Sequence, residues 1–276
     1  ELIVLVIGTI LLGVFFWAET KIKTPMLPVT LMKDRRFVLV SAQTLVLFAG
    51  FQSAMYFLSF LYIQAFGYTA LQAGAASLPI SVIVFFISAR AGHMATIYGP
   101  RLILFSSAAL MAISLFWLSF ADGNYLRSVF PGMIVMGIAV GLFAAPLTTV
   151  AMAAAGPGRD GLASGVNNAV SRIGPLLGIA VFGYWIGGDY ALNLTTALSD
   201  TNLSADKQAF LIDNRAMIAA ITLPADWPLA EQENIMRLIR NLFASSLQEV
   251  LRISALFAVG AAILALFYRK DDARSE

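Results

Sequence analysis

The sequence contains no cysteine and only one histidine among its 276 residues. Disulfide bonds and thiolate metal sites therefore cannot form, and cysteine usage says nothing about the redox compartment. Charged residues make up only 12% of the chain, and the stretch from Phe37 to Ala89 has none. A charge-free stretch of that length crosses the roughly 30 Å hydrocarbon layer twice, at about 20 residues per helix. A soluble globular domain is therefore excluded.

Apolar residues are abundant instead, at 59% of the chain, with a mean hydropathy of +0.80. The predicted fold class is an all-α integral membrane protein. We expect membrane spans over residues 2–18, 37–64, 69–89, 102–121, 128–151, 161–187 and 245–268, with Pro79 interrupting the third and Asp160 as N-cap of the sixth. Glu1 is followed at once by an apolar run without the features of a signal peptide, so we expect a fragment whose N-terminal portion is missing.

Basic residues of the short loops gather on one side of these predicted spans. That side holds Lys21, Lys23, Lys33, Arg35, Arg36, Arg90, Arg101, Arg159, Arg269, Lys270 and Arg274, whereas the other side's short loops hold only Arg127. The positive-inside rule makes the first side cytoplasmic. Residues 19–36 are then a cytoplasmic loop, 269–276 a cytoplasmic tail, and the N-terminus of this chain lies outside. A polar insert over 189–243 becomes extracytoplasmic, with helix-like pieces after Ser204 and after Pro228.

Two stripes of small and polar residues run along the sixth predicted span. The first comprises Gly161, Gly165, Asn168 and Arg172, and the second Asn167, Ser171, Gly174 and Gly178. Small residues let helix backbones approach closely and buried polar groups need partners, so both stripes are predicted to pack against other helices. The two asparagines are either structural hydrogen-bonding groups or substrate contacts.

Arg172 is expected roughly 18 Å along its helix from Asp160, where an isolated guanidinium needs a carboxylate, carbonyl groups or a water-filled cavity. None of the predicted spans carries an acid near that depth. One interpretation is that the partner of Arg172 lies in the missing portion. Arg172 would then serve a conformational switch or bind an anionic substrate. The alternative is an arginine that extends to the cytoplasmic interface.

A mixed polar and aromatic stripe runs along the second predicted span. It consists of Ser41, Phe48, Gln52 and Ser59, flanked by Thr44, Met55 and Tyr56. Apolar area with a few adaptable polar groups suits a cavity for amphiphilic substrates; packing against a neighbouring helix is the alternative. Gln43 points the other way and is expected to hydrogen-bond between helices.

Four short motifs together resemble the fourteen-helix drug/proton antiporters of the major facilitator superfamily. They lie at Leu71–Gly74, Gly92–Arg101, Ala145–Thr148 and Gly161–Asn168, in matching order and spacing. The resemblance implies that 37–268 is the C-terminal six-helix half of the transporter fold and that 1–18 is the end of a linker helix. It also places the second predicted span beside the central cavity, and the 189–243 segment is similar to an extracellular insert of some of these exporters.

One of these motifs is incomplete. The superfamily's cytoplasmic loop motif, Gly-x-x-x-Asp-Arg-x-Gly-x-Arg, aligns with Gly92, Thr96, Ile97, Gly99 and Arg101, so the acid and the first base are absent. A gating role by resemblance therefore rests on Gly92, Gly99 and Arg101 alone.

The predicted function is part of a multidrug or small-molecule exporter that exchanges substrate for protons by alternating access. The implied partners are the missing N-terminal half, the lipid bilayer, a small amphiphilic substrate and a periplasmic adaptor, with no nucleic acid. No cofactor, metal site or catalytic residue is predicted, because His93 stands alone and no acid cluster lies at membrane depth. The expected location is the bacterial inner membrane. The alternatives are a seven-helix receptor and a truncated regulatory partner without transport of its own.

Overall fold

The computed structural model describes residues 2–19, 21–22, 33–156, 158–201 and 203–268. Its elements are α1 (Leu2–Glu19), α3 (Arg35–Phe60), the π-helix η1 (Leu61–Ala65), α4 (Ala70–Ala76), α5 (Leu78–Tyr98), α6 (Pro100–Leu118), the π-helix η2 (Tyr125–Val129), α7 (Phe130–Ala155), α8 (Asp160–Ser199), α9 (Ala205–Asp213), the 3-10 helix η3 (Arg215–Ala220) and α10 (Leu229–Leu266). The predicted tail 269–276 and most of the predicted loop 19–36 lie outside the described residues.

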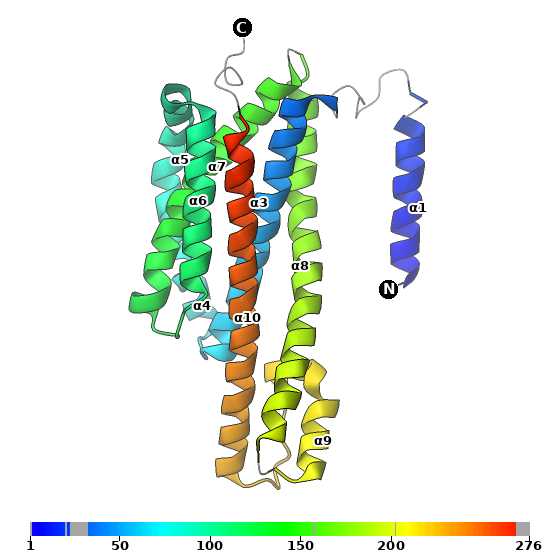
Figure 1. Cartoon of the computed structure of the whole chain (residues 1–276), viewed down its shortest axis with the longest axis vertical. Helices are drawn as coiled ribbons and strands as arrows, with labels where there is room; N and C mark the ends of the chain where they lie inside the picture. The colour runs from blue at the N-terminus through cyan, green and yellow to red at the C-terminus, as the bar shows by residue number, and fades with distance from the viewer. Residues whose placement is uncertain (1, 20, 23–32, 157, 202, 269–276) are drawn as a thin grey trace.

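Six helical segments of the described chain are long and apolar enough to cross a membrane. They are Arg35–Ala65, Ala70–Tyr98, Pro100–Leu118, Tyr125–Ala155, Asp160–Ser199 and Leu229–Leu266. These segments match the second to seventh predicted spans, and the predicted all-α membrane fold is confirmed. The first predicted span forms α1, which Figure 1 shows to one side of the six-helix bundle.

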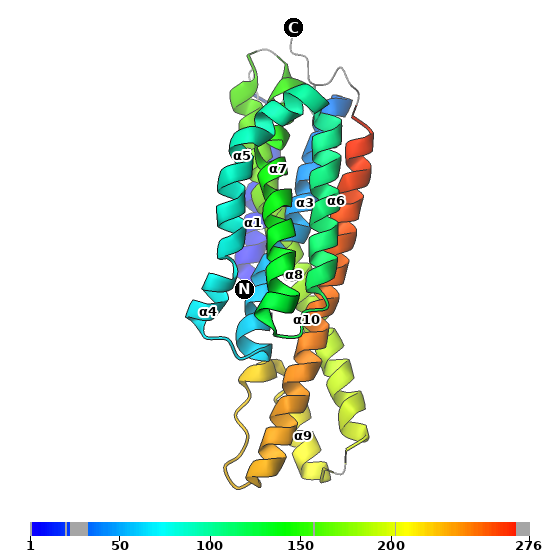
Figure 2. The ribbon, with the colours of Figure 1, turned by 90° about the vertical axis from the view of Figure 1, so that its left-hand side faces the viewer.

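Helix α3 occupies the centre of the bundle. It packs against α8 and α10, and its Phe48 and Phe51 rings lie 5.5 and 6.2 Å from the Phe143 ring of α7. Helix α5 packs on α7, and α6 packs on both α7 and α10 (Figures 1 and 2). Since lipid is as apolar as these side chains, the contacts are held by close packing and by hydrogen bonds between helices.

The third span is broken where the sequence predicts it. Helix α4 ends at Ala76 and α5 begins at Leu78, with Pro79 in the first turn of α5. Proline is tolerated there because the first N–H groups of a helix have no acceptor within it. A capping box starts α4: Gln72 N–H donates to Thr69 Oγ1 (3.2 Å) and Thr69 N–H donates to Gln72 Oε1 (2.9 Å).

The predicted loop from Arg90 to Arg101 is wrong. Helix α5 continues to Tyr98 and α6 begins at Pro100, so the connection is Gly99 alone. Gly99 has a φ of 83°, a left-handed conformation that favours glycine, and the following proline suits the first turn of a helix. The charged residues of this stretch therefore lie on helix ends rather than in a loop.

The extent of the sixth and seventh helices also differs from the prediction. Helix α8 runs to Ser199 instead of ending near Gly187, and α10 begins at Leu229. At about 1.5 Å per residue, helices of 40 and 38 residues are roughly 60 Å long, about twice the hydrocarbon thickness. Both helices project beyond the ends of α3 and α6 at the same side (Figures 1 and 2), which we call the α9 end.

The two projecting segments, together with α9 and η3, form an extension with its own apolar core. The 189–243 insert is therefore largely helical. Buried apolar residues recur every fourth position on both long helices: Tyr190, Leu194 and Leu198 on α8, and Ile235, Ile239 and Phe243 on α10. Trp227 closes the core, with its ring 5.6 Å from Phe210, and Lys207 forms a 2.5 Å ion pair with Glu231. The predicted helix-like pieces after Ser204 and Pro228 are α9 and the start of α10.

Two helix-end predictions are settled by backbone geometry. Asp160 is the first residue of α8, and Arg159 is the N-cap, so the predicted capping role of Asp160 is wrong. Its carboxylate still lies in the first turn, where it complements the helix dipole. The predicted Asp122 turn is present at the α9 end, where Asp122 accepts from Ser128 Oγ at 2.7 Å. That hydrogen bond, aided by the Asn124 N–H, holds the pKa of the Asp122 carboxyl below its ordinary value.

Candidate functional site

Gly174 and Gly178 let α8 lie directly against the backbone of α3. A Cβ added at Gly174 would lie 2.9 Å from the Leu45 carbonyl oxygen, and one added at Gly178 would lie 2.7 Å from the Ala49 carbonyl oxygen and collide with Ser53 Oγ. Only a residue without a side chain fits at this distance. The second stripe of the sixth predicted span is therefore a helix contact, which we call the glycine seam (Gly174 and Gly178).

Two buried hydrogen bonds flank the glycine seam. Thr44 Oγ1 of α3 donates to Asn167 Oδ1 of α8 at 3.0 Å, and Ser53 Oγ donates to the Pro175 carbonyl at 3.2 Å. Thr44 and Ser53 are fully buried. Buried hydroxyl and amide groups at a helix contact fix the helices in register because an unpaired polar group there is costly. Asn167 is thus a structural hydrogen-bonding residue, as one of the two interpretations of the sequence had it.

The polar stripe predicted on α3 lies on the surface of the bundle, in the angle between α7 and α8. Phe48 is half-buried against Phe143 of α7, and Ser41 is also half-buried. Gln52, Tyr56 and Ser59 are exposed; Tyr56 is 46% accessible. Their packing partners within the bundle are few, and Ser59 Oγ donates to its own helix at Met55 O (3.2 Å). The assignment of this stripe to a substrate cavity remains a prediction.

The first stripe of α8 lies on the surface of the described bundle. Gly161, Gly165, Asn168 and Arg172 are all exposed, and a Cβ added at either glycine would meet nothing within 4 Å. These positions therefore form no close helix contact within the described chain. Their packing against other helices stays a prediction. The stripe adjoins the glycine seam on the open surface of α8.

Gln43, on the opposite side of α3, links that helix to α10 and to Tyr268 just past its end. Its Nε2 donates to the Ala261 carbonyl of α10 at 3.1 Å, and Tyr268 Oη donates to its Oε1 at 2.8 Å. Both side chains are about 99% buried. The expected hydrogen bond between helices is confirmed, and the sequence did not identify the partners because they lie more than 200 residues away.

The three predicted gating positions lie around the α5–α6 connection. Gly99 makes the turn, Gly92 lies within α5, and Arg101 is exposed in the first turn of α6. Arg101 has no hydrogen-bond or ion-pair partner within the described chain, so the ion-pair network of the complete motif has no counterpart among these residues. His93 is exposed nearby, and its carbonyl accepts from Thr96 Oγ1 at 2.7 Å.

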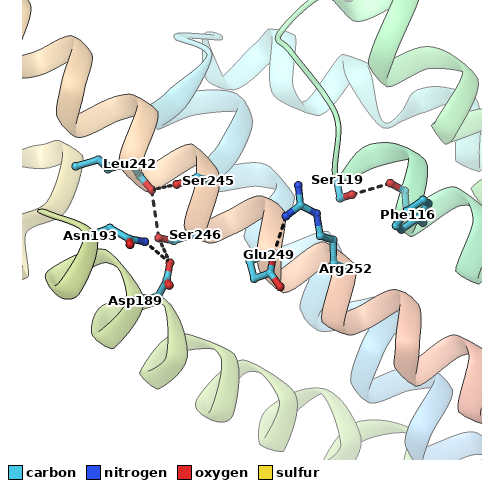
Figure 3. A network of polar contacts seen from close by, with 9 residues as sticks. All are labelled: Phe116, Ser119, Asp189, Asn193, Leu242, Ser245, Ser246, Glu249 and Arg252. Carbon is cyan, nitrogen blue, oxygen red and sulfur yellow. Dashed lines mark hydrogen bonds and ion pairs between the residues drawn. The ribbon is translucent and has the colours of Figure 1, made fainter. Parts of the chain in front are cut away.

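A polar network at the base of the extension was missed by sequence reasoning (Figure 3). Asp189 Oδ2 accepts from Ser246 Oγ of α10 at 2.6 Å and from Asn193 Nδ2 at 3.0 Å. Continuing the helical period of the sixth span past Gly187 would have placed Asp189 and Asn193 on one face. One turn further along α10, Glu249 and Arg252 pair at 2.7 Å, and Arg252 lies 5.4 Å from the Phe120 ring. This pair is thus level with the end of α6.

Hollows in the described chain lie at the α9 end. One of about 540 Å³ lies between α4 and η2 and includes Tyr68, Gln72 and Tyr125. Another, of about 590 Å³, lies between the α6–η2 turn and α10 and includes Asp122, Arg240 and Gln248. Neither includes a member of the exposed stripes on α3 and α8. Those stripes are an open face, which becomes a cavity only if another structure covers it.

The sequence of this chain is similar to those of known proteins. The model of the Major Facilitator Superfamily matches residues 2–179. The chain belongs to this superfamily. It is 29% identical over 192 residues to the multidrug resistance protein Stp of Mycobacterium tuberculosis, a match that covers 68% of this chain and 36% of that protein.

Two further relatives have similar coverage. The chain is 30% identical over 172 residues to the methylenomycin A resistance protein of Bacillus subtilis, covering 61% of this chain and 37% of that protein. It is 26% identical over 186 residues to the multidrug export protein EmrB of Escherichia coli K12, a match that covers 66% of this chain and 36% of that protein. The match therefore spans little more than a third of the length of these transporters. The resemblance seen in the four motifs is confirmed at the level of the family.

Proposed function

We propose that this chain is the C-terminal half of a proton-driven exporter of small amphiphilic compounds. The observation that carries the proposal is the open polar face of the bundle. Gln52, Tyr56 and Ser59 of α3 are exposed, as are Asn168 and Arg172 on the adjoining face of α8. Polar groups at membrane depth face protein or water rather than lipid. A second six-helix bundle over this face would enclose a site near the midplane, as in transporters built from two repeats.

The alternating-access mechanism then assigns roles to the elements. The glycine seam and its two hydrogen bonds keep α3 and α8 together, so that the bundle moves as one body against the other half. Substrate would bind at the exposed stripes when the face opens to one side and leave when it opens to the other. The acids of α8 and α10 that lie nearest the bundle, Asp189 and Glu249, are level with the α9 end of α6 rather than with the middle of the bundle. By family resemblance the proton-carrying acid belongs to the other half.

The proposed setting is the bacterial inner membrane. The basic residues of the short connections put the α5–α6 connection in the cytoplasm. The α9 end, with the 189–243 extension, would then face the periplasm, where a periplasmic adaptor would make its contact, and the N-terminus of the chain would lie outside. Family membership argues against the seven-helix receptor.

A transport assay tests the proposal. The full-length gene product that carries this chain is reconstituted in proteoliposomes with an imposed pH gradient, and movement of a fluorescent amphiphile is followed. We expect uptake against its gradient that stops when a protonophore collapses the pH gradient. The chain alone, reconstituted as a control, should not transport because the site forms between two halves. Uptake that ignores the protonophore would refute proton coupling, and transport by the chain alone would refute the half-transporter assignment.

A further inference from the structure

Arg172 is a cation at membrane depth that the described chain leaves without a partner. We propose that the substrates of this exporter are amphiphilic anions, and that Arg172 is the residue that selects them. The inference rests on the proposed function and names its substrate class.

The position of Arg172 along α8 is close to the middle of the membrane. It lies 12 residues after Asp160 and 17 residues before Asp189, or roughly 18 Å and 25 Å along the helix. The hydrocarbon layer is about 30 Å thick. Gly174, two residues further along, contacts the backbone of α3 at Leu45 and Ala49, in the middle of that span. An arginine side chain from this depth does not easily reach either interface.

The guanidinium has no hydrogen bond or ion pair within the described residues, and the side chain is exposed. The two acids of α8 and α10 nearest the bundle lie level with the end of α6 and are occupied: Asp189 accepts from Ser246, and Glu249 pairs with Arg252, which lies over the Phe120 ring. Arg90, within α5, donates to its own helix at Phe86 O (3.1 Å). A charge without a partner is unfavourable at this depth in the membrane. An anion that binds beside Arg172 is therefore stabilised by the whole of its attraction to the guanidinium.

The surroundings of Arg172 suit an amphiphile rather than a small inorganic anion. Ile173 and Leu176 are 50% and 69% exposed beside it, and the adjoining stripe of α3 adds the Phe48 and Tyr56 rings. A guanidinium forms paired, charge-assisted hydrogen bonds with a carboxylate or sulfonate, while these apolar side chains cover the substrate body. A cationic amphiphile would instead be repelled, since no acid of the described spans faces this depth.

Two permanently charged probes with the same alkyl chain length distinguish a preference for anionic substrates from a preference for cationic ones. Transport of decanesulfonate and of decyltrimethylammonium is measured in proteoliposomes containing the full-length gene product. We expect kcat/KM for the anion to exceed that for the cation at least tenfold. Arg172→Gln should lower the anion value about tenfold or more, the size of one lost charge-assisted hydrogen bond, and leave the cation value within twofold. Arg172→Lys should keep part of the anion activity, because it retains the charge without the paired donors.

The control is Arg159→Gln, on the same helix but exposed at its end, which should change neither value. Equal loss of both substrates in Arg172→Gln would assign Arg172 to structure or to a conformational switch and overturn the inference. A preference of the unaltered protein for the cation would overturn it too, while leaving the proposed function intact. Failure to move either probe or any other amphiphile would refute the proposed function itself.

A measurement on the unaltered protein covers the case in which Arg172→Gln does not fold. Decanesulfonate should raise the thermal unfolding midpoint in proportion to ligand binding, and decyltrimethylammonium should not, because only the anion compensates the guanidinium. Equal midpoints with the two probes would contradict the assignment.

Discussion

Ser53 of α3 lies directly over Gly178 of α8, and its hydroxyl donates to the carbonyl of Pro175 on the same helix at 3.2 Å. Pro175 has no N–H, so α8 lacks one of its own hydrogen bonds at this point. The acceptor left without that bond is the Ser171 carbonyl, four residues earlier, so the Ser53 hydrogen bond to the Pro175 carbonyl is an additional contact between the helices. The close approach at Gly178 and the hydrogen bond to Pro175 therefore form one contact.

Gly178→Ala should destabilise the bundle. The new Cβ would lie 2.7 Å from the Ala49 carbonyl oxygen, which is backbone and cannot rotate away, and overpacking of this kind costs about 1–3 kcal/mol. Thermal unfolding in detergent should show a clearly lower midpoint. Gly165→Ala is the matched control on the same helix, since nothing lies within 4 Å of its added Cβ and alanine favours a helix. Equal midpoints for the two variants would contradict the glycine seam.

Gln43 and Tyr268 should be energetically coupled across the bundle. Gln43→Leu removes two buried hydrogen bonds, the one to Ala261 and the one from Tyr268, and should cost about 1–3 kcal/mol. In a double-mutant cycle with Tyr268→Phe we expect a coupling of about 0.5–3 kcal/mol. Denaturant unfolding of the four proteins measures it. A coupling near zero would mean that the 2.8 Å hydrogen bond contributes nothing to stability.

Hydrophobic periodicity predicted the six bundle spans and the break at Pro79, because long apolar runs have few alternatives in a membrane. It failed past Gly187, where α8 becomes polar on one face while Tyr190, Leu194 and Leu198 continue the buried one. A hydropathy average includes both the polar and the apolar face of this part of α8, so its value is typical of a loop. The candidate site was predicted in part: the glycine seam and Gln43 follow from residue type, but the orientation of Gly161 and Gly165 depends on where α3 lies.

Trp227 should hold the extension together without affecting the bundle. Its ring packs on Phe210 at 5.6 Å and lies 5.1 Å from Lys207 Nζ. Trp227→Ala removes a large buried side chain and should cost the extension about 3–5 kcal/mol. Hydrogen exchange followed by mass spectrometry should speed up over residues 205–220 and stay unchanged in α3 and α6. Trp185→Ala, on the 49% exposed tryptophan of α8, is the control. If exchange rises across the whole bundle, the extension does not have a core of its own.

Gly99 should be intolerant of any side chain. Its φ of 83° makes the whole turn between α5 and α6, and a residue with a Cβ pays about 1–2 kcal/mol in that conformation. Gly99→Ala should therefore lower the unfolding midpoint. Gly92→Ala, helical and with no neighbouring atom within 4 Å, should leave it unchanged or raise it. The reverse order of midpoints would show that the connection does not depend on the left-handed conformation.

The proposed transport site requires that the exposed stripe of α3 face water and substrate. This chain contributes no cysteine, so single cysteines can be placed in a full-length product whose other cysteines, where present, are replaced. Gln52→Cys is compared with Phe116→Cys, on the 54% exposed outward side of α6. We predict that a charged, membrane-impermeant thiol reagent modifies the cysteine at 52, that substrate slows this modification, and that the cysteine at 116 does not react. The cysteine at 116 should react only with a lipid-soluble maleimide. If the cysteine at 52 behaves in the same way, the stripe faces lipid, which would contradict the proposed transport site.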